Sequence, residues 1–237
     1  YAAGTSLSSQ NVVIGTYAMQ NNSGGLGCNV VIGRSAGTNN CGCFNTIIGH
    51  GAGYNATAAI NSILIGCGAG RCRSGTKNIA IGECTLWGTS TPADNNGGYN
   101  IAFGYQSLND NISGGCNIAL GRQAGQKITT GAQNVFIGSN AGDQDDDGTY
   151  QVFIGCGAGA CMQGTANIAL GFQALQGSST PGNNSGEHNI ALGAYAGQDI
   201  TSGVCNVFIG EDAGKDTTTS KDNVSIGSCA GHGNETG

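Results

Sequence analysis

The stretch "NVFIGSNAG" (residues 134–142) decides the fold, because close variants of it recur along the whole chain. Its pattern is N-h-x-h-G, where h is apolar, and we number positions from the glycine, so that Asn134 is at −4 and Ala141 at +3. The motif recurs thirteen times, at steps of 16 to 22 residues. Its glycines are Gly15, Gly33, Gly49, Gly66, Gly82, Gly104, Gly121, Gly138, Gly155, Gly171, Gly193, Gly210 and Gly227.

The flanking positions are nearly as regular as the glycine. Position −4 is Asn except at Ser62 and Gln151, and position +3 is Ala except at Thr85 and Ser107. A fixed step of this size indicates stacked units, each too small to bury a core alone. Each unit has one short β-branched segment between Asn and Gly, which is typical of strand and turn. We therefore predict an all-β fold, a β-solenoid (β-roll or parallel β-helix) of about thirteen coils of 16–22 residues.

A longer period lies on top of the short one. The two 22-residue steps, after Gly82 and Gly171, are 89 residues apart, and so are Cys67 and Cys156. We expect a single solenoid domain over residues 1–237, built from an approximately 89-residue, five-coil super-repeat without evident caps. "YAAG" (1–4) and "GSCAGHGNETG" (227–237) match parts of a coil. Open ends that stack head to tail are one interpretation, and a fragment of a longer protein is the other.

Alternation along the strand assigns the side chains to two faces. We expect the uniformly apolar positions −3 and −1 to face the core. Position −2 is never charged, and we interpret it as an outward apolar stripe that contacts another chain, a second buried layer being the alternative. The predicted stripe comprises Val13, Val31, Ile47, Leu64, Phe136, Phe153 and Phe208. The asparagines at −4 are expected to form a stacked ladder, with Asn29, Asn45, Asn117, Asn134, Asn167 and Asn206 as members.

Composition excludes several classes of protein. The 237 residues carry a net charge of −6 with only 8 Lys and Arg, so binding of nucleic acid through its phosphates is not expected. No apolar run approaches the ~20 residues of a membrane span. Eleven cysteines favour an oxidising compartment, and their odd number leaves at least one free or paired between chains.

"DQDDDG" (143–148) is the strongest candidate for a metal site. Asp143, Asp145 and Asp147 occupy positions 1, 3 and 5 of a calcium loop, and Gly148 occupies position 6. Position 12, which should be a bidentate Glu, is Ile154. A calcium site and a solvated acidic turn both remain open. No cofactor is required, and Ca²⁺ is the only candidate.

The cysteine spacings favour disulfides over zinc, because no pair of C-x₂-C motifs occurs. We expect Cys67 to pair with Cys72, Cys156 with Cys161, and Cys28 with Cys41 or Cys43. Residues five coils apart are too distant to bond along a straight stack. The candidates for bonds between chains are Cys116, Cys205 and Cys229.

No catalytic constellation is visible. His50, His188 and His232 are scattered, without a Ser, Asp or Cys arrangement around them. The glycine-rich "GCGAG" turns (66–70 and 155–159) lack the Lys-Ser/Thr of a phosphate-binding loop. The chain is therefore not expected to be an enzyme.

Three repeats, "NIALGFQAL" (167–175), "NIAFGYQSL" (100–108) and "NIALGRQAG" (117–125), resemble the N-T-A-I-G-x-x-A-L repeats of tail-fibre-like proteins of phages and large viruses. "NVVIGRSAG" (29–37) is similar to the head repeats of trimeric autotransporter adhesins. The resemblance implies a segment of an extracellular or virion-surface fibre, often homotrimeric, that holds or makes a host-contact surface. This chain lacks heptad stalk segments and a tip domain, and it is unusually rich in cysteine.

Three functional hypotheses follow. The first is a structural fibre or filament subunit, extracellular or on a virion surface, that assembles with itself through the apolar stripe and the open ends. The second is an adhesin or receptor-binding segment that contacts cell-surface glycans through Tyr17, Trp87, Tyr105 and Tyr195. The third is an ice-binding solenoid, which needs a regular array of threonines that no position here provides.

Overall fold

The computed structural model describes residues 10–22, 27–179 and 183–234. Within these residues it contains thirteen parallel three-residue strands and no α-helix, which confirms the predicted all-β solenoid. Contacts divide the chain into two compact units, 1–117 and 118–237, which are treated one at a time below. Residues 1–4 and 235–237, part of the predicted open ends, lie outside the described residues.

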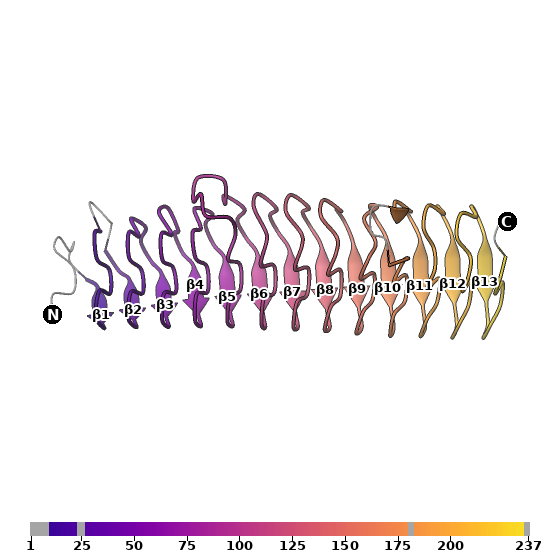
Figure 1. The fold of residues 1–237 in the computed structure, drawn as a ribbon, viewed down its shortest axis with the longest axis horizontal. Coiled ribbons are helices and arrows are strands. Elements are labelled where there is room, and N and C mark those ends of the chain that lie inside the picture. Colours follow the sequence, from indigo (N-terminus) through magenta and orange to yellow (C-terminus); the bar gives the residue numbers. More distant parts are fainter. Residues whose placement is uncertain (1–9, 23–26, 180–182, 235–237) are drawn as a thin grey trace. The chain divides into compact units, whose positions relative to one another are not determined.

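Unit 1 contains six strands, one per coil. They are β1 (Val12–Ile14), β2 (Val30–Ile32), β3 (Thr46–Ile48), β4 (Ile63–Ile65), β5 (Ile79–Ile81) and β6 (Ile101–Phe103). Each strand pairs in parallel with the next at the same motif position, so that Val31 lies beside Ile47 and Ile47 beside Leu64. Figure 1 shows these strands succeeding one another in chain order along the solenoid.

Unit 2 repeats this arrangement with seven strands. They are β7 (Ile118–Leu120), β8 (Val135–Ile137), β9 (Val152–Ile154), β10 (Ile168–Leu170), β11 (Ile190–Leu192), β12 (Val207–Ile209) and β13 (Val224–Ile226). The register is again motif on motif, with Phe136 beside Phe153 and Phe153 beside Ala169. Every residue of a strand therefore lies in a column of residues that share one motif position.

The motif glycine is required where the strand ends, because neighbouring coils approach each other closely there. Gly33 has φ +138°, and a Cβ added to it would lie 2.5 Å from the carbonyl oxygen of Gly49 in the next coil. No side chain fits at that distance, and an L-residue disfavours that φ. The repeat therefore tolerates only glycine at this position.

The structure corrects the predicted assignment of the two strand faces. The −2 residues Val31, Ile47, Leu64, Phe136, Phe153 and Phe208 are at most 1% exposed, and Val13 is half-buried. They form the core and not an outward stripe, so the alternative of a buried layer was the correct one. The residues at −3 and −1 face outward, and none of them is buried. The reason is alternation itself, because −2 shares its side of the strand with the asparagine at −4, which is buried.

The asparagine ladder is confirmed as a set of side-chain to backbone bonds. The Oδ1 of Asn29 accepts the backbone N–H of Asn45 at 3.0 Å, and that of Asn134 accepts the N–H of Gln151 at 2.9 Å. The same bond joins Asn100 to Asn117, Asn167 to Asn189 and Asn206 to Asn223. These buried amides stabilise the stack because each satisfies a backbone group that has no strand partner.

Candidate functional site

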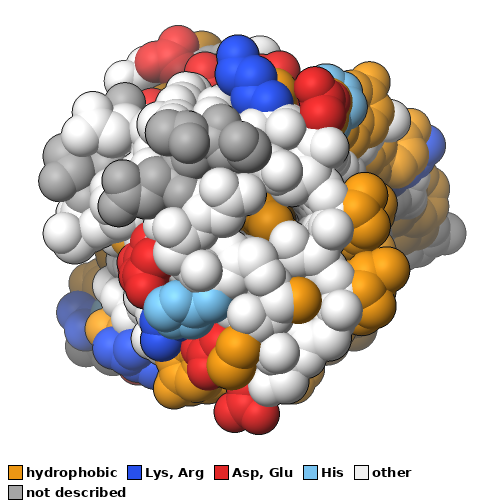
Figure 2. Space-filling model, turned by 90° about the vertical axis from the view of Figure 1, so that its right-hand side faces the viewer, with side chains coloured by type: hydrophobic (Ala, Val, Ile, Leu, Met, Phe, Trp, Pro, Cys, Tyr) orange, Lys and Arg blue, Asp and Glu red, His pale blue; other side chains and the backbone are white. Residues whose placement is uncertain are grey.

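The outward face of the strands is an apolar surface in each unit. Unit 1 presents twelve side chains at −3 and −1, of which Thr46 is the only polar one, and unit 2 presents fourteen, all apolar. Phe103 is 55% exposed, and Ile154 and Leu170 are 36% and 37% exposed. Figure 2, which views the end of unit 2, shows hydrophobic side chains gathered on one flank of that end. Apolar patches of this extent mark contact surfaces.

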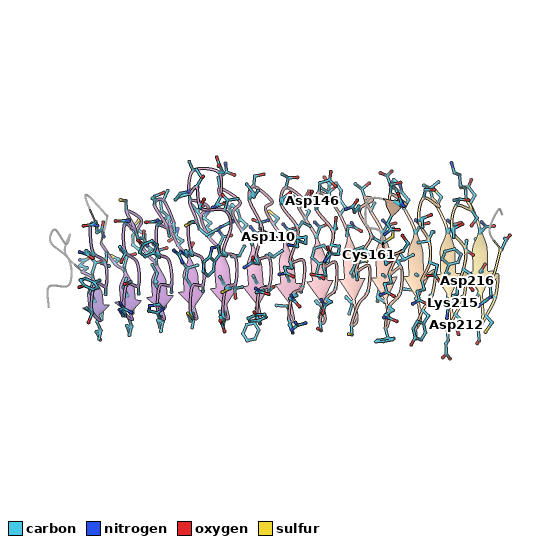
Figure 3. The ribbon with its side chains drawn as sticks, in the orientation of Figure 1. Asp110, Asp146, Cys161, Asp212, Lys215 and Asp216 are labelled. Atoms are coloured by element: carbon cyan, nitrogen blue, oxygen red, sulfur yellow. The ribbon has the colours of Figure 1, made fainter. Side chains whose placement is uncertain are left out.

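The acidic loop does not bring its three predicted ligands together. Asp145 is fully buried, Asp147 is exposed, and Asp143 lies between these extremes. Figure 3 shows Asp146, from the same loop, on the side of the coil away from the strands. Across residues 10–22, 27–179 and 183–234, no group of three or more His, Cys, Asp or Glu is arranged to hold a metal ion. The calcium site stays a prediction.

Asp145 instead supports the loop from inside. Its Oδ1 accepts the N–H of Gly148 at 2.9 Å, and its Oδ2 accepts the Nε2–H of Gln151 at 2.7 Å. Burial raises the pKa of Asp145 to about 8, and the nearby Asp147 and Asp146 add to the rise, while the two hydrogen bonds oppose it. Asp145 is therefore a structural group, and its ionised form is unfavourable because the carboxyl is buried.

The predicted local disulfides are not formed, because all eleven cysteines are free thiols. The partners differ in environment in all the predicted pairs except Cys28 and Cys41, which are both exposed. Cys67, Cys156 and Cys28 are exposed, whereas Cys72 and Cys43 are buried and Cys161 is half-buried. The candidates for bonds between chains, Cys116, Cys205 and Cys229, are exposed, and their pairing stays a prediction.

The turns of unit 1 contain a trough with a volume of about 260 Å³. One wall comes from position +5 of three successive coils, where Tyr54, Arg71 and Trp87 stack. The guanidinium carbon of Arg71 lies 5.0 Å from the centroid of the Tyr54 ring and 4.8 Å from that of Trp87. His50 and Cys67, both at +1, form the opposite wall.

Two glycines at position +2, Gly51 and Gly68, form the floor of the trough. A Cβ added to Gly51 would meet no atom within 4 Å, so the space above it is open. The backbone does not demand glycine there. Position +2 has a left-handed φ in every coil, yet ten of the thirteen coils carry another residue, for example Gln106 at φ 53° and Gln123 at φ 55°. The backbone does not require the glycine at residue 51, and its lack of a side chain leaves the trough open there.

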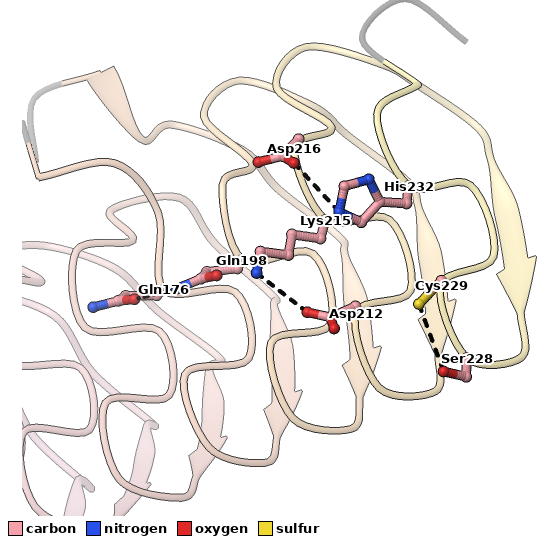
Figure 4. A network of polar contacts seen from close by, with 8 residues as sticks. All are labelled: Gln176, Gln198, Asp212, Lys215, Asp216, Ser228, Cys229 and His232. Atoms are coloured by element: carbon pink, nitrogen blue, oxygen red, sulfur yellow. Dashed lines mark hydrogen bonds and ion pairs between the residues drawn. The ribbon is translucent and has the colours of Figure 1, made fainter.

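In several turns of unit 2, though not in the turn of Gly157 and Ala160, a side chain crosses from +2 to +5. Asn140 Nδ2 donates to Asp143 Oδ2 at 3.2 Å, and Lys215 Nζ lies 3.3 Å from Asp212 Oδ1. Figure 4 shows Lys215 bridged to Asp212 in this way. Position +5 is polar in this unit except at Ala160, and Gln198 Nε2 donates to Gln176 Oε1 of the preceding coil at 3.0 Å. The open trough is thus a feature of unit 1 and not a by-product of the repeat.

Below the trough, Arg73 is buried in the interior of unit 1. Its guanidinium donates to the carbonyl oxygens of Gly97 at 2.7 Å and Asn111 at 2.6 Å, and to Asn111 Oδ1 at 3.1 Å. Its Nε has no partner. Burial lowers the pKa of Arg73 to about 10, which shows that the cation is poorly solvated there.

Sequence reasoning found only part of this region. Trp87 was predicted to contact a glycan and lines the trough, but Tyr54 and Arg71 were missed. Of the other predicted aromatic contacts, Tyr17 and Tyr105 are exposed and Tyr195 is half-exposed. No histidine was placed near a nucleophile, yet Cys67 Sγ lies 3.8 Å from His50 Nδ1 in the neighbouring coil. Aligning the coils at +1 and +5 brings these residues together.

The comparisons with known proteins found no relative of this chain. No family model, curated protein or solved structure matches the chain. No helix in the described ranges combines the length and apolarity needed to cross a membrane.

Proposed function

We propose that the chain is a structural subunit of an extracellular or virion-surface fibre and that copies assemble through the outward strand face. The observation that carries the proposal is the uncharged face of the strands, with fourteen apolar side chains in unit 2 alone. A surface of this kind is costly to leave in water and is typical of subunit contacts.

The repeat itself favours another copy of the chain as the partner. The outward columns are ridges in which successive side chains are spaced by the ~4.8 Å distance between strands. A second copy presents the same ridges at the same spacing, so the two faces interdigitate along their length. Most other protein surfaces lack this period, and so they match only a few side chains of the face. The extracellular or virion-surface location rests on the cysteine content and on the resemblance of the repeats to fibre proteins.

The test is a charge placed in the middle of the face. Ile154→Asp puts a short acidic side chain at position −1 of β9, where a second copy would bury it without a partner. We expect the assembled species to disappear in light scattering and negative-stain images, while circular dichroism still shows a folded solenoid. Ile154→Thr keeps the β-branched shape and is expected to weaken assembly without abolishing it.

The matched control is Ala166→Asp, which adds the same charge at position −5 of the next coil. That column accepts aspartate, since Asp222 lies there with φ 58° against 55° for Ala166. The control is expected to assemble as the unmodified chain does. If Ile154→Asp folds and assembles normally, or if the unmodified chain remains monomeric at all concentrations, the proposal is wrong.

A further inference from the structure

We propose that the trough of unit 1 binds a small ring compound that carries a carboxylate or sulfate group, such as an acidic sugar unit. The inference goes beyond self-assembly and does not rest on it, because the trough lies in the turns and the assembly face lies on the strands.

The first argument is that the space is kept open. Ten coils place a side chain at the left-handed +2 position, so the backbone does not need glycine at residue 51, where an added Cβ would meet no atom within 4 Å, while Gly68 leaves room for the Trp87 ring. In unit 2, side chains at this position reach across to +5, as Asn140 does to Asp143. A cavity of about 260 Å³ lies just below the ~300–1,000 Å³ usual for sites of drug-sized ligands, which suits a single ring.

The second argument is the chemistry of Arg71. Its guanidinium lies about 5 Å from two aromatic rings, which hold its plane in one orientation. It has no carboxylate partner among the described residues. A fixed, unpaired guanidinium recognises carboxylate and sulfate oxygens through paired N–H groups. His50 and Ser35 supply further polar groups along the trough.

The third argument concerns the ring of the ligand. The lining of the trough is mostly apolar, and Trp87 overlies Gly68, where an added Cβ would come within 2.7 Å of Trp87 Cζ3. An indole beside a cation offers an apolar surface to a ring whose charged substituent meets the guanidinium. An inorganic anion alone leaves this surface uncovered, and a neutral sugar leaves the cation unpaired.

Electrostatics favours an anion at this unit. Unit 1 has four Lys and Arg against three Asp and Glu, a net charge of +1, whereas unit 2 has four against eleven, a net charge of −7. The exposed Arg34 lies one coil before His50 and adds to the positive potential near the trough. Unit 1 therefore attracts anions that unit 2 repels.

The chain carries its own reporter, because Trp87 is its only tryptophan. We would titrate the full chain with glucuronate, glucose 6-sulfate, glucose and inorganic sulfate, following Trp87 fluorescence with calorimetry as a second readout. Glucuronate or glucose 6-sulfate, or both, should give saturable binding, and the stronger of them identifies the anionic group. Glucose and inorganic sulfate should bind at least about tenfold more weakly, as expected when a charge-assisted hydrogen bond or the ring contact is lost.

Two variants and one control locate the binding. Gly51→Gln fills the trough with a side chain that the same column accepts in Gln106, Gln123 and Gln173, and it should abolish binding without lowering the melting temperature. Arg71→Ala should weaken the anionic ligands at least tenfold. Gly157→Gln makes the same change in unit 2 and should leave binding unchanged. Binding that survives Gly51→Gln, glucose binding as tightly as both acids, or no binding by either acid would overturn the proposal.

Discussion

Residues 50–111 and 139–200 are related by the 89-residue super-repeat. They share the residues that form the coils, and they differ in the residues of the turns and of the interior beneath the turns. Both have the asparagine ladder, the motif glycines and the buried −2 column. Their turns differ most where the trough lies. Gly51, Tyr54, Arg71 and Trp87 in the first region correspond to Asn140, Asp143, Ala160 and Gln176 in the second.

The interiors beneath these turns differ as well. Asn95 and Asn184 make the same bonds in both regions, from Nδ2 to the carbonyl oxygens of Cys72 and Cys161. Around them, Arg73 and Asn111 in the first region are replaced by Met162 and Ile200 in the second. The comparison shows that positions −4, −2, 0 and +3 determine the fold, whereas positions +2, +5 and +7 vary independently of it.

The largest expected effect comes from breaking the polar cluster of the first region. Arg73→Met leaves the carbonyl oxygen of Asn111 and its side chain without their buried donor. Each buried polar group left unpaired costs ~1–3 kcal/mol, so we expect the free energy of unfolding to fall by about 2–4 kcal/mol. Chemical denaturation measures the change.

The second region supplies the compensating change. Arg73→Met combined with Asn111→Ile reproduces the pair Met162 and Ile200 and removes a cation whose burial lowers its pKa to about 10. Replacing a buried polar cluster by apolar side chains of similar size is often neutral or stabilising. The double variant should therefore recover most of the loss. If it is no more stable than Arg73→Met alone, the two interiors are not interchangeable.

An effect that depends on pH is expected at Asp145, whose counterpart in the first region is Ala56. Because burial raises the pKa of Asp145 to about 8, the folded chain holds this proton more tightly than the unfolded chain does. Its contribution to stability is complete below pH ~4 and is lost as pH rises to about 8, by at most ~1.4 kcal/mol per pH unit.

Asp145→Asn removes this titration while keeping the shape of the side chain. The same +7 position is a buried asparagine in Asn40 and Asn111, so the fold accepts the change. The buried Oε1 of Gln151, which has no hydrogen-bond partner, can accept the new amide N–H after rotation of its own amide, at the cost of the Nε2 bond to the carbonyl oxygen of Gly164, and a protonated Asp145 makes the same demand. The variant should be more stable than the unmodified chain at pH 9 and equal to it near pH 4. Parallel stability curves for the two proteins between pH 4 and 9 would contradict the assignment.

The solenoid of stacked coils was predictable from the sequence because it depends on the spacing of the motifs. The assignment of the two strand faces was not. Uniformly apolar residues at −3 and −1 predict a core from the sequence alone, yet these positions face outward. The variation at −2 is compensated inside the coil. Phe153 faces Gly159, where an added Cβ would clash with the ring, whereas Ala80 and Ala169 share their coils with the buried Leu86 and Leu175 at +4. In these coils a large residue at one of the positions −2 and +4 accompanies a small residue at the other, as expected of a packed interior.

The trough was harder to predict, because no local motif encodes it. Tyr54, Arg71 and Trp87 are separated by 17 and 16 residues, and they meet only because each lies at +5 of its coil. The glycines at 51 and 68 look like ordinary repeat glycines until the other coils show that +2 tolerates side chains. The predicted disulfides, none of which is formed between the described cysteines, raise a related point, since spacing along the chain does not report which side of a turn faces inward.

The smallest expected effect on stability, and the sharpest test of the comparison, is a transplant of the trough. Asn140→Gly, Asp143→Tyr, Ala160→Arg and Gln176→Trp rebuild the wall and floor of unit 1 in the turns of unit 2. Asn140, Asp143 and Gln176 are half-buried and lose part-buried polar contacts such as the Gln198 to Gln176 bond, whereas Ala160 is only 9% exposed, so the new arginine must extend outwards from the turn. We therefore expect a melting temperature within a few degrees of the original. Calorimetry should show two sites in place of one, the second weaker because it lies in a unit of net charge −7. A folded variant with only one site would show that the residues of the trough depend on features of unit 1 beyond positions +2 and +5.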